Sequence, residues 1–421
     1  MEPTTAFESP ITAPSNSADE VRAFYESHPY PAPLGNLDKH RELYRNPDRR
    51  RAASLLLWPA GSRRKDREIL IAGCGTSQAA AHAMRDPDAR VTAIDISETS
   101  LRHTRALQRK YELQNLDLVR LAIEDVGELG RVFDEIVCTG VLHHLPDPDA
   151  GLRALRHALA PDGALHLMVY AAYGRAGIYM MQEYCRLIGV RATEDELRDL
   201  GDTIGGLADD HPIALVAKRA KDFRRPDALA DALLHPQDRA YDVPQLYLWL
   251  ERCGLSFARW FEQAPYLPQC GAIAAMPHAA RLALLPPPKQ HAAVELLRGT
   301  MTKHSFIAHR DDCPGESQPI QFDGDSWLSY VPLRLPWTLC VRERLPEGAA
   351  AVLVNRAHAY PDLALSINSA QARVFATIDG KQSCAEILSR AAPGQGGEQA
   401  RAFIKRLWEY DQIVFDASNL R

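Results

Sequence analysis

Two glycines and one aspartate stand at a spacing suited to holding a nucleoside. Gly73 and Gly75 follow an apolar run in the segment AGCGTSQ, and a turn without a Cβ lets the backbone approach a ligand closely. Asp95 ends the next apolar run, about 20 residues beyond Gly75, where an acidic side chain meets the hydroxyls of a ribose. The pattern predicts a nucleoside-binding turn. The alternative is a plain strand-to-helix turn in which Asp95 only caps a helix.

The third glycine of a dinucleotide-binding turn is missing from this segment. Gln78 holds that position after Gly73 and Gly75. The substitution disfavours NAD, and an oxidoreductase is therefore the weakest of the enzyme classes considered for this chain.

Further polar residues follow two later apolar runs. His143 and His144 are adjacent in TGVLHHLPD, so at most one is expected to face a substrate. With an ordinary pKa of about 6.5, that histidine could act as a base near neutral pH. The alternative is that both only orient the turn or cap the next helix. Tyr173 and Arg175 could hold a carboxylate or phenolic substrate, or else an ion pair that anchors a lid.

Apolar runs that alternate with helical patterns would position these residues. The runs lie at 68–73, 90–95, 116–123, 134–140 and 164–170, and helical periodicity lies at 77–85, 101–113 and 150–159. This alternation predicts an α/β fold with a parallel sheet covered by helices on both faces, and ligands at the carboxyl ends of its strands. Runs at 254–263 and 303–310 are expected to form an antiparallel pair at the edge of the sheet.

Composition excludes several other classes of protein. The chain has 421 residues, 46% hydrophobic and 24% charged, with a formal net charge of -5, which disfavours nucleic-acid and anionic-membrane partners. No apolar run approaches the roughly 20 residues that span a bilayer, so a cytoplasmic location is expected. Eight single cysteines without metal-ligand spacing indicate reduced thiols and no metal site.

The segment FDEIVCTGVLHHLPDPDAGLRALRHALAPDGALHLMVY resembles the S-adenosylmethionine-dependent methyltransferases of the Rossmann-like, seven-strand type. The resemblance implies that S-adenosylmethionine is the cofactor and that the glycine turn contacts its methionine part. It also implies the cofactor-binding residues Gly73, Gly75, Asp95 for the ribose, Ile96 on the adenine, Ile123 or Glu124 at the adenine edge, and Thr139 and Gly140 beside the cofactor. Two residues depart from the family pattern. Ile71 stands where many members have an acid, and Ser77 replaces the last glycine of the turn.

The N-terminal segment FYESHPYP resembles the one that precedes the core in a poorly characterised bacterial branch of these enzymes. Tyr25 and Tyr30 are expected to fold over the cofactor, because a sulfonium cation is attracted to the face of an aromatic ring. The alternative is that both tyrosines merely pack on the sheet.

The predicted organisation has five parts. They are disordered residues 1–18, an N-terminal arm at 19–67, a methyltransferase domain at 68–310 with a helical lid insertion at about 171–250, a linker at 311–330, and a C-terminal domain at 331–421. The last part is expected to be small and mainly helical. It resembles a winged-helix module, similar to peptide-binding domains found beside enzymes that modify ribosomal peptides, although dimerisation or docking is favoured over peptide recognition.

The predicted function is transfer of a methyl group to a small, natural-product-like acceptor, with His143, His144 and Tyr173 as candidate catalytic residues. The alternative is a methyltransferase or a binding protein for a ribosomal peptide recognised through the C-terminal module. The expected partners are the small-molecule or peptide substrate and a second copy of the chain in a homodimer. Nucleic acid and membrane are not expected as partners.

Overall fold

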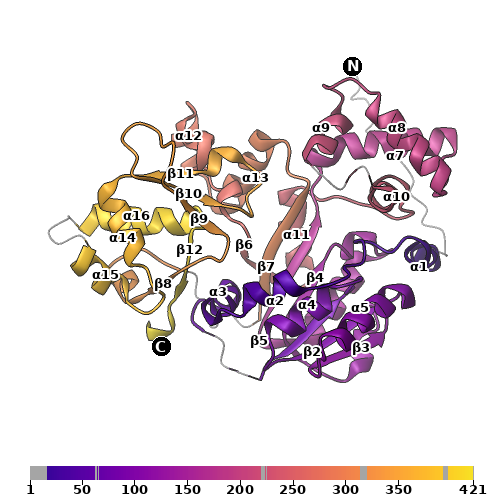
Figure 1. Cartoon of the computed structure of the whole chain (residues 1–421), viewed down its shortest axis with the longest axis horizontal. Helices are drawn as coiled ribbons and strands as arrows, with labels where there is room; N and C mark the ends of the chain where they lie inside the picture. The colour runs from indigo at the N-terminus through magenta and orange to yellow at the C-terminus, as the bar shows by residue number, and fades with distance from the viewer. Residues whose placement is uncertain are drawn as a thin grey trace, which may run out of the picture.

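A computed structural model describes residues 17–61, 64, 66–219, 223, 225–312, 320–391 and 397–420 of the chain. The disorder predicted for 1–18 therefore lies almost wholly outside the described residues, as does the middle of the predicted linker. Figure 1 shows a central sheet, a group of helices at the upper right, and a C-terminal part at the left.

The central sheet has seven strands in the order β3-β2-β1-β4-β5-β7-β6. Its parallel strands are β1 (Glu68–Ala72), β2 (Arg90–Asp95), β3 (Leu116–Arg120), β4 (Phe133–Thr139) and β5 (Leu159–Tyr170). Strands β6 (Leu255–Trp260) and β7 (Lys303–Arg310) close one edge, and β7 runs antiparallel to both β5 and β6. The predicted α/β sheet and its antiparallel edge are confirmed.

Burial on both faces explains the near-continuous apolar runs. In β1, Ile69 and Ile71 pack under α4 (Gln78–Arg85) and α5 (Glu98–Lys110), while Leu70 and Ala72 join the core on the opposite face. Successive side chains of a strand point to opposite faces, so a sheet covered by helices on both sides needs apolar residues at every position. Helix α6 (Pro148–Ala158) packs on the face of the sheet opposite to α4 and α5.

The helices between β5 and β6 divide into two groups. Four of them, α7 (Ala176–Ile188), α8 (Glu194–Gly205), α9 (Pro212–Arg219) and α10 (Pro226–Leu234), share a hydrophobic core of their own. The fifth, α11 (Val243–Arg252), packs in the main core through Trp249. We call α7–α10 the helical insertion, which stands at the upper right of Figure 1.

The N-terminal arm consists of α1 (Ser17–Ser27), α2 (Asp38–Tyr44) and α3 (Pro47–Leu57). Helix α1 lies between α5 and the helical insertion. The Glu26 carboxylate accepts hydrogen bonds from the Glu98 and Thr99 amides, at 2.7 and 3.1 Å, at the start of α5. Phe24 packs against the core of the helical insertion. The arm therefore connects the insertion to the sheet.

The C-terminal part, expected to be mainly helical, contains α14 (Ser369–Thr377), α15 (Cys384–Ala391) and α16 (Gly397–Glu409) among its described residues. It also contains more strand than predicted. Strands β9 (Thr338–Val341), β10 (Ala351–Asn355) and β11 (Leu365–Ile367) form an antiparallel sheet, and β8 (Val331–Arg334) pairs with β12 (Ile413–Asp416). Runs of three to five residues carry little periodicity, which is why these short strands do not stand out in the sequence. The winged-helix resemblance stays a prediction.

The C-terminal part packs directly on the sheet. One hydrophobic cluster joins Leu56 of α3, Ile307 of β7 and Val414 of β12. The buried Asp411 carboxylate accepts hydrogen bonds from the Ala264 amide at 2.9 Å and from Arg259 at 3.3 Å. Two short helices, α12 (Ala279–Ala283) and α13 (Pro287–Arg298), fill the segment between β6 and β7.

Among the described residues, no helix is long and apolar enough to cross a bilayer. A search of the same residues finds no cluster of histidine, cysteine and carboxylate side chains that could hold a metal ion.

Candidate functional site

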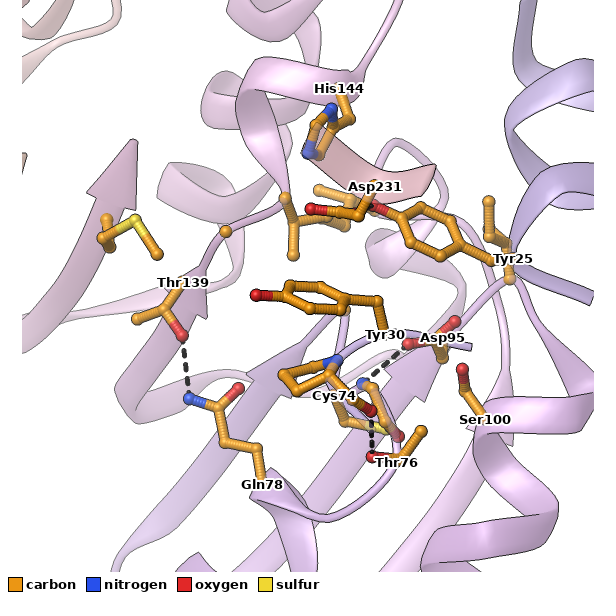
Figure 2. Close-up of a pocket in the computed structure, with 18 of the residues that line it drawn as sticks. Tyr25, Tyr30, Cys74, Thr76, Gln78, Asp95, Ser100, Thr139, His144 and Asp231 are labelled. Atoms are coloured by element: carbon orange, nitrogen blue, oxygen red, sulfur yellow. Dashed lines mark hydrogen bonds between the residues drawn. The ribbon is translucent and has the colours of Figure 1, made fainter. Parts of the chain in front are cut away.

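A cavity of about 510 Å³ lies at the carboxyl ends of the parallel strands (Figure 2). The turn after β1, the ends of β2, β4 and β5, and the loop after β4 form its floor. Helix α1, the Tyr30–Pro31 segment and helix α10 of the insertion contribute the other walls. Three parts of the chain far apart in sequence therefore meet around one space.

The turn after β1 is built on glycines that no other residue could replace without strain. Gly73 has φ +70°, and an added Cβ would lie 2.4 Å from a methyl of Val141. Gly75 has φ +55°. The Gly73 and Cys74 amides both donate to the Ile94 carbonyl, at 2.9 and 3.0 Å, which places the turn directly beside the end of β2.

Asp95 is held in place by two backbone amides, one from the turn after β1 and one from just beyond the end of β2. One carboxylate oxygen accepts from the Gly75 amide at 2.8 Å, and the other accepts from the Ser97 amide at 2.9 Å. Burial raises the pKa of Asp95, and these two backbone hydrogen bonds oppose the rise. Each carboxylate oxygen keeps a further lone pair. The carboxylate is therefore fixed and ready to accept the hydroxyls of a ribose.

Apolar side chains next to Asp95 provide a surface for a base. Ile96, Leu121, Ile123 and Leu145 all line the cavity. Of the two residues predicted at the adenine edge, Ile123 is among the lining residues, whereas Glu124 is exposed and is not among them. A glycine cradle, a fixed carboxylate and an apolar wall together fit the nucleoside of S-adenosylmethionine.

Gln78, which replaces the third glycine, has a structural partner at the end of β4. Its side-chain amide donates to the Thr139 hydroxyl at 2.8 Å (Figure 2). Gly140 follows with φ +81° and also lines the cavity. In the sequence, Gln78 indicates only that NAD is disfavoured, and no local pattern predicts its contact with Thr139. Ile71, the other departure from the family pattern, has an apolar side chain that is fully buried in the core. It therefore contributes no polar group to the cavity.

Tyr25 and Tyr30 both line the cavity, as the lid interpretation requires. The Tyr25 hydroxyl donates to Asp231 at 3.3 Å. The Tyr30–Pro31 segment is fastened to the glycine turn, because the Thr76 hydroxyl donates to the Pro31 carbonyl at 2.8 Å. Figure 2 shows the Tyr30 ring with Cys74, Thr76 and Gln78 on one side and with Asp231 and His144 on the other.

The two adjacent histidines take different places. His144 lines the cavity, and its Nδ1 donates to the Gln237 carbonyl at 2.7 Å. His143 is fully buried behind the cavity wall, with its ring 3.9 Å from that of Tyr170. Neither ring nitrogen of His143 has a hydrogen-bond partner among the described residues. The expectation that only one of the pair faces a ligand agrees with this arrangement.

We expect the His144 imidazole to be neutral at pH 7. Burial lowers its pKa to about 4, and the Arg175 guanidinium adds to the effect. An NMR titration of histidine ring carbons should show His144 protonating far below the ordinary value of about 6.5. In the unfolded chain His144 takes up its proton near pH 6.5, whereas in the folded protein its pKa is about 4. Protonation therefore favours the unfolded chain, and His144 lowers the stability of the protein as the pH falls from about 6.5 toward 4. A midpoint near 6.5 would contradict the expectation, and the His144→Gln variant identifies the signal.

Asp231 is a cavity residue that the sequence analysis missed. It lies on α10 and is 3% exposed, and its two carboxylate oxygens accept from the hydroxyls of Tyr25 and Tyr170, each at 3.3 Å. Burial raises the pKa of Asp231 to about 7. One signal in the sequence could have found it. Asp231 stands within the apolar run ALADALL, which predicts a buried helix, and an acid is rarely fully buried unless it is paired.

A buried ion pair holds the base of the helical insertion. Arg175 donates to Asp238 at 2.9 Å, and its guanidinium lies 3.5 Å from the centre of the Tyr170 ring. Gln182 also donates to Asp238, at 2.9 Å. Of the two roles considered for Arg175, the structure shows the lid-anchoring ion pair. Tyr173 is 42% exposed and is not among the residues that line the cavity.

The family profile described as a methyltransferase domain matches residues 70–165. This segment is a methyltransferase domain. It covers β1 to β5 and includes the glycine turn, Asp95 and both histidines. The predicted methyltransferase class is confirmed for this domain, and the sheet has the predicted seven-strand form.

Similar proteins extend over different shares of the chain. An uncharacterised protein of Synechococcus sp. is 34% identical over 275 residues, which are 63% of this chain and 65% of that protein. The ubiquinone biosynthesis O-methyltransferase of Xanthomonas axonopodis pv. citri is 34% identical over 128 residues, which are 29% of this chain and 48% of that enzyme. The chain thus spans less than two thirds of the length of these curated relatives.

A solved structure resembles nearly the whole fold. PKMT2 from Rickettsia typhi in complex with AdoHcy aligns with a TM-score of 0.59 over 87% of this chain and 73% of that one, at 15% sequence identity. At this identity the similarity concerns the fold alone. It extends well beyond the methyltransferase domain, so the additions to the seven-strand sheet also have a structural counterpart.

Proposed function

We propose that this chain transfers the methyl group of S-adenosylmethionine to a small, natural-product-like acceptor. The observation that carries the proposal is a single cavity with two chemically different ends. Gly73, Gly75 and Asp95 form the end that suits the cofactor, and His144, Tyr170 and Asp231 form a polar end in front of β4 and β5. Both ends belong to one space, as a direct transfer requires.

The volume of the cavity supports a small acceptor. Sites for one small molecule measure roughly 300–1,000 Å³, and this cavity of about 510 Å³ has to hold the nucleoside cofactor as well as the acceptor, which leaves room only for a small acceptor. Tyr25 of α1 and Asp231 of α10 line the cavity from two outer walls, and the hydrogen bond between their side chains joins these walls. These walls limit the size of an acceptor and exclude water from the reacting groups.

When bound, S-adenosylmethionine supplies a methyl group on a positively charged sulfur that an acceptor can displace. The residues of this chain align the two reactants. The Asp95 carboxylate orients the ribose, the glycine turn allows close approach of the backbone, and Tyr25 and Tyr30 cover the site with aromatic faces that attract a cation.

A peptide acceptor is the second candidate, and the C-terminal sheet favours it. Strand β9 lies at the edge of the three-stranded sheet, and its side chains Leu339 and Val341 are 45% and 39% exposed. Extended peptides bind such edges by adding a strand. A second copy of the chain could use the same edge, so homodimerisation stays a prediction.

Labelled methyl transfer separates the two candidates. A cell extract is first divided by a small-pore filter into a small-molecule fraction and a polypeptide fraction. The purified protein is then incubated with each fraction and with S-adenosylmethionine that carries a labelled methyl group. Label in the small-molecule fraction is the expected result. Label only in polypeptides would favour the peptide acceptor. No label, together with no calorimetric binding of S-adenosylhomocysteine, would contradict methyl transfer altogether.

A further inference from the structure

The polar end of the cavity is built around one carboxyl group. Asp231 is nearly fully buried on α10, and each of its oxygens accepts a hydrogen bond from a tyrosine of a different element. Tyr25 comes from α1 and Tyr170 from the end of β5. Two phenol hydroxyls stabilise a carboxylate without neutralising it. The group is therefore positioned from two sides while it still faces the cavity.

The charged groups around Asp231 do not cancel its charge. The Arg175 guanidinium lowers the pKa of Asp231, but this group is already paired with Asp238, whose charge raises that pKa. His144 and His235 are neutral at pH 7, because burial lowers both pKa values. Lys303 and Asp95 line the same cavity. No ion pair joins Asp231 to any residue that the structure describes.

We propose that Asp231 faces the sulfonium end of the bound cofactor and accepts the proton that the acceptor loses during methyl transfer. The inference rests on the proposed function and deepens it, since it assigns a proton acceptor to a residue outside the matched methyltransferase domain. As the acceptor attacks, the sulfur–methyl bond breaks with its electron pair left on sulfur, a new bond joins the methyl group to the acceptor atom, and the proton of that atom passes to the carboxylate.

The same geometry limits the chemical class of the acceptor. The polar end presents hydrogen-bond acceptors, namely the Asp231 carboxylate and the Nε2 of His144, which has no hydrogen-bond partner among the described residues. A hydroxyl or amine hydrogen can be received there. An acceptor whose nucleophilic atom lies beside its own carboxylate or phosphate would place like charges next to Asp231. We therefore assign an uncharged or cationic acceptor that bears an O–H or N–H group.

Cofactor binding itself tests the position of Asp231 without any acceptor. A cation in the cavity favours the ionised carboxyl, whereas the neutral sulfide of S-adenosylhomocysteine does not. Because the pKa of Asp231 is about 7, S-adenosylmethionine should release about half a proton per site at pH 7 beyond what S-adenosylhomocysteine releases. Calorimetry of both ligands in phosphate and in Tris, which differ in ionisation enthalpy, measures this difference.

Two variants decide whether Asp231 is the source of the proton. In Asp231→Asn the difference between the ligands should fall to zero, while S-adenosylhomocysteine still binds. Asp227→Asn is the matched control, because this carboxylate stands one turn earlier on α10 and contacts Arg225. The control should keep the full difference. An unchanged difference in Asp231→Asn would overturn the inference.

The wild-type protein alone keeps the inference falsifiable if Asp231→Asn does not fold. The difference in proton release should be largest near and below pH 7 and should vanish above about pH 9, where Asp231 has no proton to lose. Equal release with both ligands at every pH would overturn the role of Asp231 and leave the proposed function intact. Failure of both ligands to bind would overturn the two proposals together.

Discussion

The Asp95→Ala variant should bind S-adenosylhomocysteine on the order of 100-fold or more weakly than the wild-type protein. Two hydrogen bonds from ribose hydroxyls to a carboxylate contribute about 1.5–3 kcal/mol each, and about 1.4 kcal/mol corresponds to a tenfold change in affinity. The substitution also removes the acceptor for the Gly75 and Ser97 amides, so the turn that receives the ligand loses its support. Calorimetric titration measures the effect.

Two further variants separate these contributions. Asp95→Asn keeps one carbonyl oxygen and should bind with intermediate affinity. Asp117→Ala removes a half-exposed carboxylate near the start of the neighbouring strand β3, which bonds Arg90 and is not among the residues that line the cavity. Its affinity should stay within about twofold of wild type, because exposed ion pairs contribute little. Wild-type affinity in Asp95→Ala would show that the ligand lies elsewhere.

Arg175→Met should be the most destabilising of the substitutions considered. It leaves the Asp238 carboxylate, 3% exposed, without its cation. Removing one partner of a buried ion pair costs about 3–5 kcal/mol, a large share of the roughly 5–15 kcal/mol that stabilises a domain. Methionine preserves much of the volume above the Tyr170 ring, so the loss of charge dominates. Urea unfolding and hydrogen exchange over α7–α10 should both report the loss.

A double variant checks that the isolated carboxylate causes the loss. Arg175→Met combined with Asp238→Asn removes both charges and should be more stable than Arg175→Met alone. The exposed pair of Arg186 and Glu183 on α7 provides the control, and Arg186→Met should change the unfolding free energy by less than about 0.5 kcal/mol. Equal stability of Arg175→Met and Arg186→Met would refute the anchoring role of Arg175.

The cofactor end of the site was predictable because it depends on residues close in sequence. Gly73, Gly75 and Asp95 stand at the ends of two neighbouring strands, and the register of β1 and β2 brings Ala72 opposite Ile94. Apolar runs of five to seven residues indicate the strands, and a glycine turn with an acid one unit later predicts a nucleoside site. Thr139 ends β4 and Gly140 follows it, so both residues are also expected at the carboxyl ends of the strands, where the cavity lies.

Other parts of the site depend on contacts that no local pattern shows. Tyr25 and Asp231 are 206 residues apart, and their contact needs α1 and the helical insertion to meet over the sheet. Glu124 and Ile123 are adjacent in sequence, and only the course of the loop decides which one lines the cavity. The strands β9 to β11 were missed because each is short and is stabilised by its neighbours.

The amino-acid sequence by itself thus determined the fold class of the methyltransferase domain and the residues at the glycine-turn end of the cavity. Periodic burial and glycine turns are local properties, and the residues that carry them lie within a single strand–helix unit. The tertiary structure alone decided which polar groups meet at the other end of the cavity. Those groups come from α1, β5 and α10, and their burial, their charge state and their mutual distances exist only once the three elements pack around one cavity.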